Sequence, residues 1–358
     1  MCDSVRAAVD FKDLAHSSPR VETALDRALV TLINDERDLP FLYLIAQCAA
    51  VALMGVGLFF VPTQYFWPAA ALYLLVWAFG VLDRFILMLH CTSHRTLFKK
   101  ERAWMNQIIP WVIGPFMGET PETYFAHHMG MHHPENNLPS DLSSTMKYQR
   151  DSFAHWLVYY LDFITLGLAR LVGYHSRKHN ARLMVRTALG ELSFLAVAFG
   201  LCSINWRASF VVFLLPLVVV RALMMAGNWG QHAFVDADDP NNAYKNSITC
   251  INSRYNRRAF NDGYHIHHHV KARTHWTELP AEFRDNIETY GREDAIVFEG
   301  IDFFMVWLFL MLGQWKTLAK HFVRLPGAPE RTEAEVIAFL QSRVRRIDVS
   351  RYATPATA

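Results

Sequence analysis

The sequence is poor in cysteine and lacks an obvious leader pattern. Five cysteines among 358 residues form no CxxC pair, and Cys48 and Cys202 lie inside apolar stretches. A disulfide framework is therefore not expected. The first forty residues lack the basic-then-apolar order of a cleavable signal peptide, so we expect the mature chain to begin near Met1.

Excess charge and the common cofactor motifs are missing as well. The formal net charge is +2, and no stripe of lysine and arginine with interleaved aromatics is present, which excludes nucleic acid as a partner. The chain has no GxGxxG fingerprint for a flavin or nicotinamide and no HPGG-type haem box. Any redox chemistry in this chain would therefore need electrons from another protein.

Apolar residues, by contrast, are abundant. Hydrophobic residues make up 52% of the chain and aromatic residues 13%, although the chain also carries 35 basic and 33 acidic side chains. The mean hydropathy is +0.09. Such values are unusual for a soluble protein and indicate a protein of the lipid bilayer.

Four apolar stretches have the length of about 20 residues that crosses the hydrocarbon core of a bilayer. They pair into two hairpins, because only short TQYF and SINWR segments separate them. Basic residues are frequent between positions 95 and 188 and nearly absent from the short loops, which places both termini and the long segments in the cytoplasm. The predicted spans are about 41–62, 67–89, 189–204 and 208–227.

The expected fold is an all-α integral membrane protein with a helical cytoplasmic cap. Its expected parts are an N-terminal cytoplasmic segment 1–40, a membrane-embedded domain 41–315 with cytoplasmic parts 90–188 and 228–315, and a cytoplasmic tail 316–358. Residues 108–118 and 301–315 are too short or too interrupted for spans and predict interfacial or buried helices. For residues 152–174 we predict an amphipathic helix on the cytoplasmic surface, because Asp162 and Arg170 interrupt it.

Histidines are the most informative residues. Eleven of the seventeen fall in four clusters: HCTSH at 90–94, HHMGMHH at 127–133, NWGQH at 228–232 and HIHHH at 265–269. Neutral imidazole is the commonest side-chain metal ligand, and one zinc ion needs only three or four, so two metal ions fit the count better. In the predicted topology all four clusters face the cytoplasm.

The spacing within the clusters suits helices. His90 and His94, like Asn228 and His232, are four residues apart, so each pair shares one helix face. The other two clusters combine spacings of three, four and five residues; their candidate ligands are His128, His132 and His133, and His265, His268 and His269. We therefore expect both spans to continue as helices beyond the bilayer and to carry ligands there.

These motifs resemble the histidine boxes of the membrane fatty acid desaturase superfamily, which includes stearoyl-CoA desaturases and related hydroxylases. HxxxH stands at His90 and His94, HxxxHH at His128, His132 and His133, and a GEGFHxxHH-like box at NDGYHIHHH. The NxxxH element matches Asn228 and His232. The resemblance covers roughly residues 40–315, and the second box leaves open whether His127 or His128 is the ligand; helical spacing to His132 favours His128.

The resemblance implies a pair of iron ions that activate dioxygen and remove hydrogen from an unactivated C–H bond of a fatty acyl chain. It implies nine metal ligands, namely His90, His94, His128, His132, His133, His232, His265, His268 and His269, and a water-mediated contact of Asn228 with iron. Carboxylates that orient such ligands are a further expectation, for which the candidates are Asp83, Asp141 and Asp262.

Several alternatives remain open at this level. The same irons would serve hydroxylation, or oxidative decarboxylation of a free fatty acid to a terminal alkene, because the outcome depends on how the substrate is held. A metal-binding sensor or transporter is a non-enzymatic alternative, although such proteins place ionisable groups inside their spans. The resemblance implies a ferredoxin, rubredoxin or cytochrome b5 with its reductase as electron donor. It leaves open the acyl carrier (CoA, carrier protein, lipid or none) and the membrane, bacterial inner membrane or endoplasmic reticulum.

Overall fold

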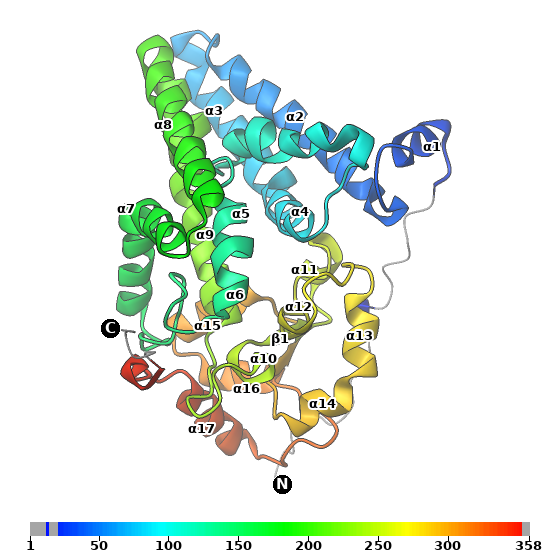
Figure 1. Cartoon of the computed structure of the whole chain (residues 1–358), viewed down its shortest axis with the longest axis vertical. Coiled ribbons are helices and arrows are strands. Elements are labelled where there is room, and N and C mark those ends of the chain that lie inside the picture. Colours follow the sequence, from blue (N-terminus) through cyan, green and yellow to red (C-terminus); the bar gives the residue numbers. More distant parts are fainter. Residues whose placement is uncertain (1–11, 14–20, 353–358) are drawn as a thin grey trace. The chain divides into compact units, whose positions relative to one another are not determined.

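The structure is a computed structural model that describes residues 12–13 and 21–352 (Figure 1). The chain divides into two compact units. We call Ser18–Gly130 with Ile164–Ala222 the span unit, and Met1–Ser17 with Met131–Phe163 and Leu223–Ala358 the sheet unit. Much of the predicted N-terminal segment, residues 1–11 and 14–20, lies outside the described residues.

Both units are mainly helical. The span unit contains α1 (Ala24–Val30), η2 (Glu36–Asp38), α2 (Leu39–Leu58), η3 (Thr63–Tyr65), α3 (Phe66–Leu75), η4 (Val76–Leu82), α4 (Asp83–His94), η5 (Lys100–Gln107), η6 (Ile108–Ile113), η7 (Gly114–Met117), α5 (Thr123–His127), α8 (Ala181–Ser209) and η9 (Phe210–Leu214). The sheet unit contains α6 (His133–Glu135), α10 (Ala243–Asn246), β1 (Thr249–Ile251), α11 (Arg254–Arg258), α12 (His265–Val270), α13 (Leu279–Asp285), α14 (Ile287–Arg292), β2 (Val297–Glu299), α15 (Phe303–Met311), α16 (Trp315–His321), α17 (Glu333–Arg343) and η10 (Val349–Tyr352). Three helices continue from one unit into the other: η8 (His128–His132), α7 (Phe153–Arg177) and α9 (Leu215–Gln231).

Four helical stretches in the described chain are long and apolar enough to cross a membrane: 36–58, 63–94, 153–177 and 181–231. The first covers residues 41–58 of the predicted span 41–62, and the second contains the predicted span 67–89. The last folds back at Asn205, whose φ of −151° and ψ of 94° break the helix. Its two arms pack together, and Ser209 Oγ donates a 2.5 Å hydrogen bond to Ala198 O across the hairpin. The prediction of a mostly helical membrane protein is confirmed.

Helix α7 is the one candidate span that the sequence analysis placed elsewhere. Its length of 25 residues and its composition are sufficient for a span, and few of its residues are buried. Charged residues within it, among them Asp162 and Arg170, favour the surface helix predicted above. Its position relative to a bilayer stays a prediction.

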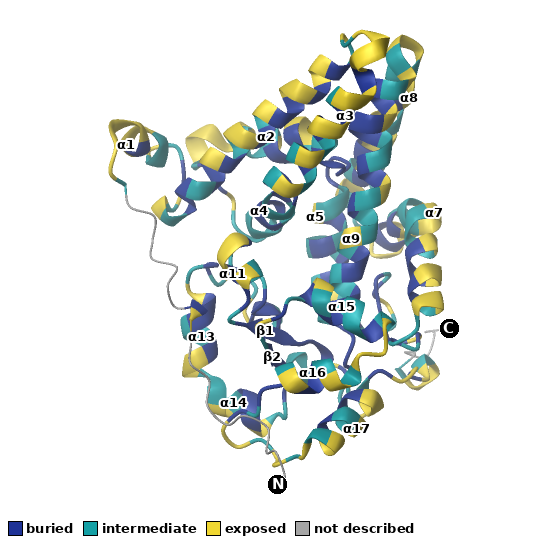
Figure 2. Cartoon of the chain, turned by 180° about the vertical axis from the view of Figure 1, so that it is seen from behind, coloured by how far each residue is buried: buried dark blue, intermediate teal, exposed yellow. Residues whose placement is uncertain are grey.

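The span helices carry large apolar side chains on their outer surfaces. Leu53 is 71% exposed, Phe79 76% and Ile204 73%. Figure 2 shows such exposed positions along α2, α3 and α8. A continuous apolar surface of this kind is unfavourable in water and suits the acyl chains of lipid.

Charged residues inside these helices are paired within the span unit. Arg221 Nη2 lies 2.7 Å from both carboxylate oxygens of Glu191, and Thr120 Oγ1 donates to Glu191 Oε2 at 2.6 Å. A charge in an apolar environment is tolerated when it is paired and hydrogen-bonded. Glu191 and Arg221 are therefore compatible with the spans that they interrupt in sequence.

The segment 108–118 is partly buried: Ile109 and Ile113 are buried, whereas Trp111 and Val112 are exposed, so the choice between the interfacial and the buried option stays open. Its π and 3-10 turns, η6 and η7, pack against α2, and η7 also packs against η9. Gly118 ends it with φ +81°, and a Cβ there would lie 2.6 Å from Pro216 O. Glycine is therefore required at this close approach.

The sheet unit surrounds two short parallel strands that the sequence analysis did not predict. Strand β1 pairs with β2 in the register Thr249 to Val297 and Cys250 to Phe298. The core beside them takes buried residues from α15 and α17, including Val306, Leu310 and Leu340. Within 301–315, where an interfacial or buried helix was predicted, the structure has α15. Helix α17 begins with a capping box formed by Thr332 and Glu335.

We predict that Gly190→Ala destabilises the span unit. A Cβ at Gly190 would lie 1.8 Å from Pro121 O, which forces the segment before α5 away from α8. Overpacking of this kind costs about 1 to 3 kcal/mol. Thermal unfolding in detergent should show a lower Tm.

Gly200→Ala is the matched control, because it lies in the same helix and a Cβ there meets nothing within 4 Å. Equal Tm values for the two variants would contradict the packing described.

Candidate metal centre

Four histidines converge inside the sheet unit. His132, His232, His265 and His269 each offer a ring nitrogen, and these four atoms all lie within 4.8 Å of one another. His232 follows the last residue of α9, and His265 and His269 lie one helical turn apart on α12. Three separate segments of the sequence thus supply one group, which we call the four-histidine group.

The nitrogen spacing in this group suits a shared ion. His265 Nε2 lies 3.2 Å from His232 Nε2 and 3.0 Å from His269 Nε2. When two nitrogens each lie about 2.1 Å from one ion and the nitrogen–metal–nitrogen angle is about 90°, the nitrogens are about 3.0 Å apart. These distances are therefore those expected between neighbouring ligands of one metal ion.

The opposite ring nitrogens of two of these histidines are held by acceptors. His132 Nδ1 lies 2.7 Å from Asp141 Oδ2, and His232 Nδ1 lies 3.0 Å from Asn246 O. A carbonyl oxygen only accepts, so Nδ1 of His232 carries the proton, and the carboxylate of Asp141 favours the same tautomer for His132. In both rings Nε2 then keeps its lone pair for a metal ion.

Burial keeps His232 neutral. The side chain is fully buried, and burial together with the neighbouring His132 lowers the pKa of His232 to about 4. The ring is thus uncharged at neutral pH, which is the form that binds a metal.

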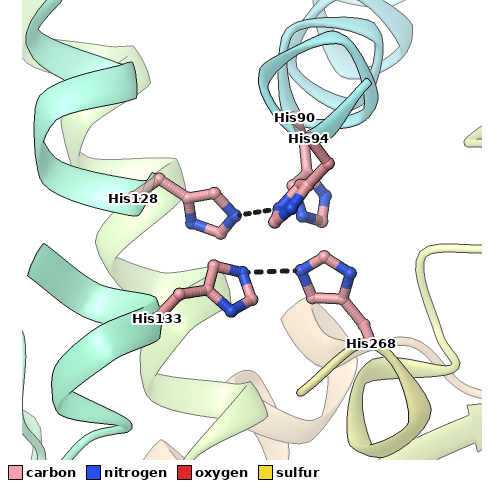
Figure 3. A group of neighbouring side chains, drawn as sticks. All are labelled: His90, His94, His128, His133 and His268. Carbon is pink, nitrogen blue, oxygen red and sulfur yellow. Dashed lines mark hydrogen bonds between the residues drawn. The ribbon is translucent and has the colours of Figure 1, made fainter. Parts of the chain in front are cut away.

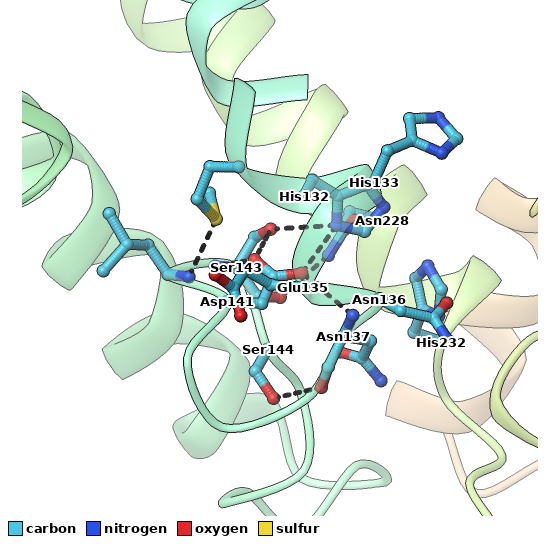
Figure 4. A network of polar contacts seen from close by, with 12 residues as sticks. His132, His133, Glu135, Asn136, Asn137, Asp141, Ser143, Ser144, Asn228 and His232 are labelled. Atoms are coloured by element: carbon cyan, nitrogen blue, oxygen red, sulfur yellow. Dashed lines mark hydrogen bonds and ion pairs between the residues drawn. The ribbon is translucent and has the colours of Figure 1, made fainter. Parts of the chain in front are cut away.

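Asp141 is the centre of a hydrogen-bond network in the loop after α6 (Figure 4). Its Oδ1 accepts from the backbone nitrogen and the hydroxyl of Ser143, each at 2.7 Å, while Oδ2 also accepts from Asn137 N at 3.1 Å. With all these donors the carboxylate is fixed in one orientation. The sequence analysis named Asp141 as a partner of a ligand, and the structure places it against His132.

Three more histidines converge inside the span unit. The ring centroids of His90, His94 and His128 lie 4.7 to 5.2 Å apart, and His94 Nε2 is 2.9 Å from His128 Nε2. The helix through α4 reaches His94, as the four-residue spacing predicted. We call these residues the three-histidine group.

The second box adopts a π-turn, η8, over His128–His132. Such turns accommodate an additional residue within a helix and occur often at functional sites. The turn explains how HxxxHH, with its additional residue, is formed without breaking the helix.

The sheet unit also holds a histidine pair. His133 Nε2 lies 2.9 Å from His268 Nε2, and the centroid of the His133 ring is 5.0 Å from that of His269. Figure 3 shows the His94 to His128 contact and, as a second contact, the His133 to His268 contact. All nine histidines predicted as ligands therefore lie next to at least one other predicted ligand.

Two further histidines of the clusters behave differently. His267 Nε2 lies 3.3 Å from Thr274 Oγ1 and 3.7 Å from a carboxylate oxygen of Glu282. Neither His267 nor His127 belongs to a metal-binding group of the described residues, whereas His128 does. The choice of His128 over His127 as the ligand stays a prediction.

For the remaining predicted site residues the structure gives contacts, while their roles at a metal stay predictions. Asn228 Nδ2 donates to Tyr159 Oη at 2.7 Å and to Ser143 O at 3.1 Å, so its amide is held beside the Asp141 loop. Its water-mediated contact with a metal stays a prediction. Asp83 accepts from Arg84 N at 2.8 Å, and its role as a partner of a ligand, like that of Asp262, stays a prediction too.

Sequence reasoning missed Asn246 and Thr145. Asn246 contacts His232 Nδ1, and Thr145 Oγ1 donates to His232 O at 2.6 Å. Thr145 lies in a loop and Asn246 ends the short helix α10, and neither belongs to a motif, so no signal in the sequence identified them. Only the folded chain brings them to His232.

The groups fit a transition metal. They offer neutral imidazole nitrogens, which suit iron, zinc, copper and nickel, and at least two rings carry the Nδ1 partners typical of metal ligands. The fold and the site together define a helical membrane protein with histidine groups able to bind metal.

The fatty acid desaturase family model matches residues 65–300. Because the match covers more than half of the chain, the chain belongs to the fatty acid desaturase family. Membership implies an oxidoreductase that acts on fatty acyl chains in a membrane. Neither the curated proteins nor the solved structures with which the chain was compared give a match.

We predict that Asp141→Asn weakens metal binding to the four-histidine group. An amide that presents Nδ2 to His132 disfavours the tautomer with Nδ1 protonated, and loss of such a partner weakens metal affinity by about 10- to 100-fold. Titration of the metal-free protein with Co²⁺ would measure this. Asp239→Asn, whose side chain is 47% exposed, should titrate like the parent protein.

Proposed function

We propose that the chain is an oxygen-dependent di-iron desaturase that introduces a double bond into a fatty acyl chain. The observation that carries the proposal is the four-histidine group, with Nδ1 partners on His132 and His232. Family membership supports it independently. Imidazole suits iron, and activation of dioxygen requires a metal that changes its oxidation state, which excludes zinc.

We assign one iron ion to the four-histidine group. The second ion takes its ligands from the other predicted histidines, because the nine histidines as a set resemble the boxes that hold two irons. Asn228 contributes through a water molecule. The assignment uses every predicted ligand and leaves out His127 and His267.

When bound, the irons supply the oxidising power that removes hydrogen from an unactivated C–H bond, which no side chain does alone. The chain's own residues hold and orient the ligand rings. Asp141 and Asn246 keep the protons of His132 and His232 on Nδ1, and burial of His232 excludes water from its ring. Fixed ligands of this kind limit rearrangement of the site during turnover.

The proposed partners follow from the same chemistry. The substrate is a fatty acyl chain, bound to CoA, a carrier protein or a lipid, or free. Electrons come from a ferredoxin, a rubredoxin or cytochrome b5 with its reductase, since the chain has no motif for a flavin, nicotinamide or haem. We place the site and both termini on the cytoplasmic side of a bacterial inner membrane or of the endoplasmic reticulum.

Product analysis tests the proposed reaction. A host that expresses the protein should accumulate acyl chains with a new double bond, detected by mass spectrometry, and only when oxygen is supplied. Hydroxy acids, or volatile alkenes one carbon shorter than the host's acids, would instead show that the site directs the reaction to hydroxylation or decarboxylation.

Two neighbouring histidines test the ligand assignment. We predict that His268→Ala abolishes turnover and lowers the bound iron, whereas His267→Ala retains most of the iron because its ring bonds to Thr274. Iron per protein, measured by atomic emission on purified variants, separates the two. An equal loss of iron in both variants would show that the third box is wrongly assigned.

A further inference from the structure

Arg150 is a buried cation that no carboxylate faces at hydrogen-bond distance among its described contacts. Its side chain is 0% exposed, and its three guanidinium nitrogens donate six hydrogen bonds, all to backbone carbonyls. Burial lowers the pKa of Arg150 to about 9, so the group stays charged at neutral pH. A buried charge is costly unless its donors are satisfied, and here the backbone of several segments satisfies them.

The acceptors come from three segments of the sheet unit. The guanidinium bonds to Ala233 O at 2.8 Å, to the carbonyls of Thr145, Met146 and Tyr148 at 3.0 to 3.3 Å, and to those of Arg343 and Arg345 at 2.8 and 2.7 Å. Ala233 is the residue after His232. One side chain thus joins the His232 loop, the loop after Asp141 and the C-terminal end of α17.

Other bonds hold the same segments in place. Thr145 Oγ1 donates to His232 O at 2.6 Å, and Trp229 Nε1 donates to Arg150 O at 2.8 Å. On the C-terminal side, Val235 N donates to Arg343 O at 3.1 Å, and an ion pair of 2.6 Å joins Arg343 to Asp236. The backbone at His232 and just after it is therefore hydrogen-bonded from two sides, by Thr145 and Arg150 and by the C-terminal segment.

We propose that Arg150 and Thr145 are positioning residues for His232, and that the C-terminal segment Arg343–Ile347 is part of the framework of the four-histidine group. The inference rests on the proposed function only in treating His232 as a metal ligand. The segment lies far outside the histidine boxes in sequence, yet it supplies two of the six acceptors that hold Arg150. Arg150 acts on the site through backbone atoms and touches no metal ligand side chain in these contacts.

Thr145→Val is the decisive variant, because it keeps the shape of the side chain and removes one bond to His232 O. We expect Co²⁺ to bind about 10- to 100-fold more weakly at one of two sites, the usual effect of losing a group that orients a ligand. The visible absorption of that cobalt ion should change as well. Thr145→Ser restores the hydroxyl and should restore both properties.

A matched control deletes an equivalent bond that does not involve the backbone of a predicted metal ligand. Thr187 Oγ1 donates to Leu183 O at 2.8 Å within α8, and Thr187 is fully buried. Thr187→Val should leave cobalt affinity and spectrum as in the parent protein, whatever its effect on Tm. Arg345→Ala, which keeps the backbone acceptor and removes an exposed side chain, should do the same.

Arg150→Lys is the second variant. An ammonium has three donors and cannot satisfy six carbonyls, so we expect a weaker cobalt site even where the protein stays folded. If Thr145→Val and Arg150→Lys bind cobalt with the affinity and spectrum of the parent protein, the positioning role is refuted, even if their Tm falls. If the parent protein itself binds no cobalt, the proposed function fails instead, and the two results are thus distinguishable.

Discussion

The site depends on the protonation and orientation of buried imidazole rings. A histidine binds a metal only when one nitrogen keeps a lone pair that points at the ion, and burial alone does not choose which nitrogen that is. In the sheet unit the choice is made by Asp141 on His132 and by the carbonyl of Asn246 on His232. Through these hydrogen bonds the surrounding fold decides which nitrogen of each ring can bind a metal ion.

The fold holds the loops next to these histidines in one conformation. Asp141 is held by Ser143 and Asn137, and the carbonyls of His232 and Ala233 accept from Thr145 and Arg150. Loops are ordinarily the mobile part of a protein. Here the buried backbone carbonyls and polar side chains pair almost entirely with one another, which fixes the loops at the cost of burying several polar groups.

The sequence predicted a large part of this arrangement because helical periodicity and apolar length are local properties. The spans follow from apolar length, and the continuation of α4 to His94 follows from residue spacing. The short β1 and β2 strands were missed, since each has only three residues and neither shows an alternation of buried and exposed positions. The sequence left η6 and η7 open between an interfacial and a buried position, because the packing of one side of this segment against α2 and η9 depends on residues far away in sequence.

The sequence by itself identified the residues that we propose to carry the chemistry, which are nine histidines in boxes and an aspartate at position 141, and it identified apolar segments long enough to span a membrane. Tertiary structure alone decided which histidines share a group, which Asn and Thr side chains fix their rings, and that residues near the C-terminus belong to the framework. The physical reason is that metal ligation needs nitrogen atoms about 3 Å apart. Residues more than a hundred positions apart reach such distances only when the whole chain packs.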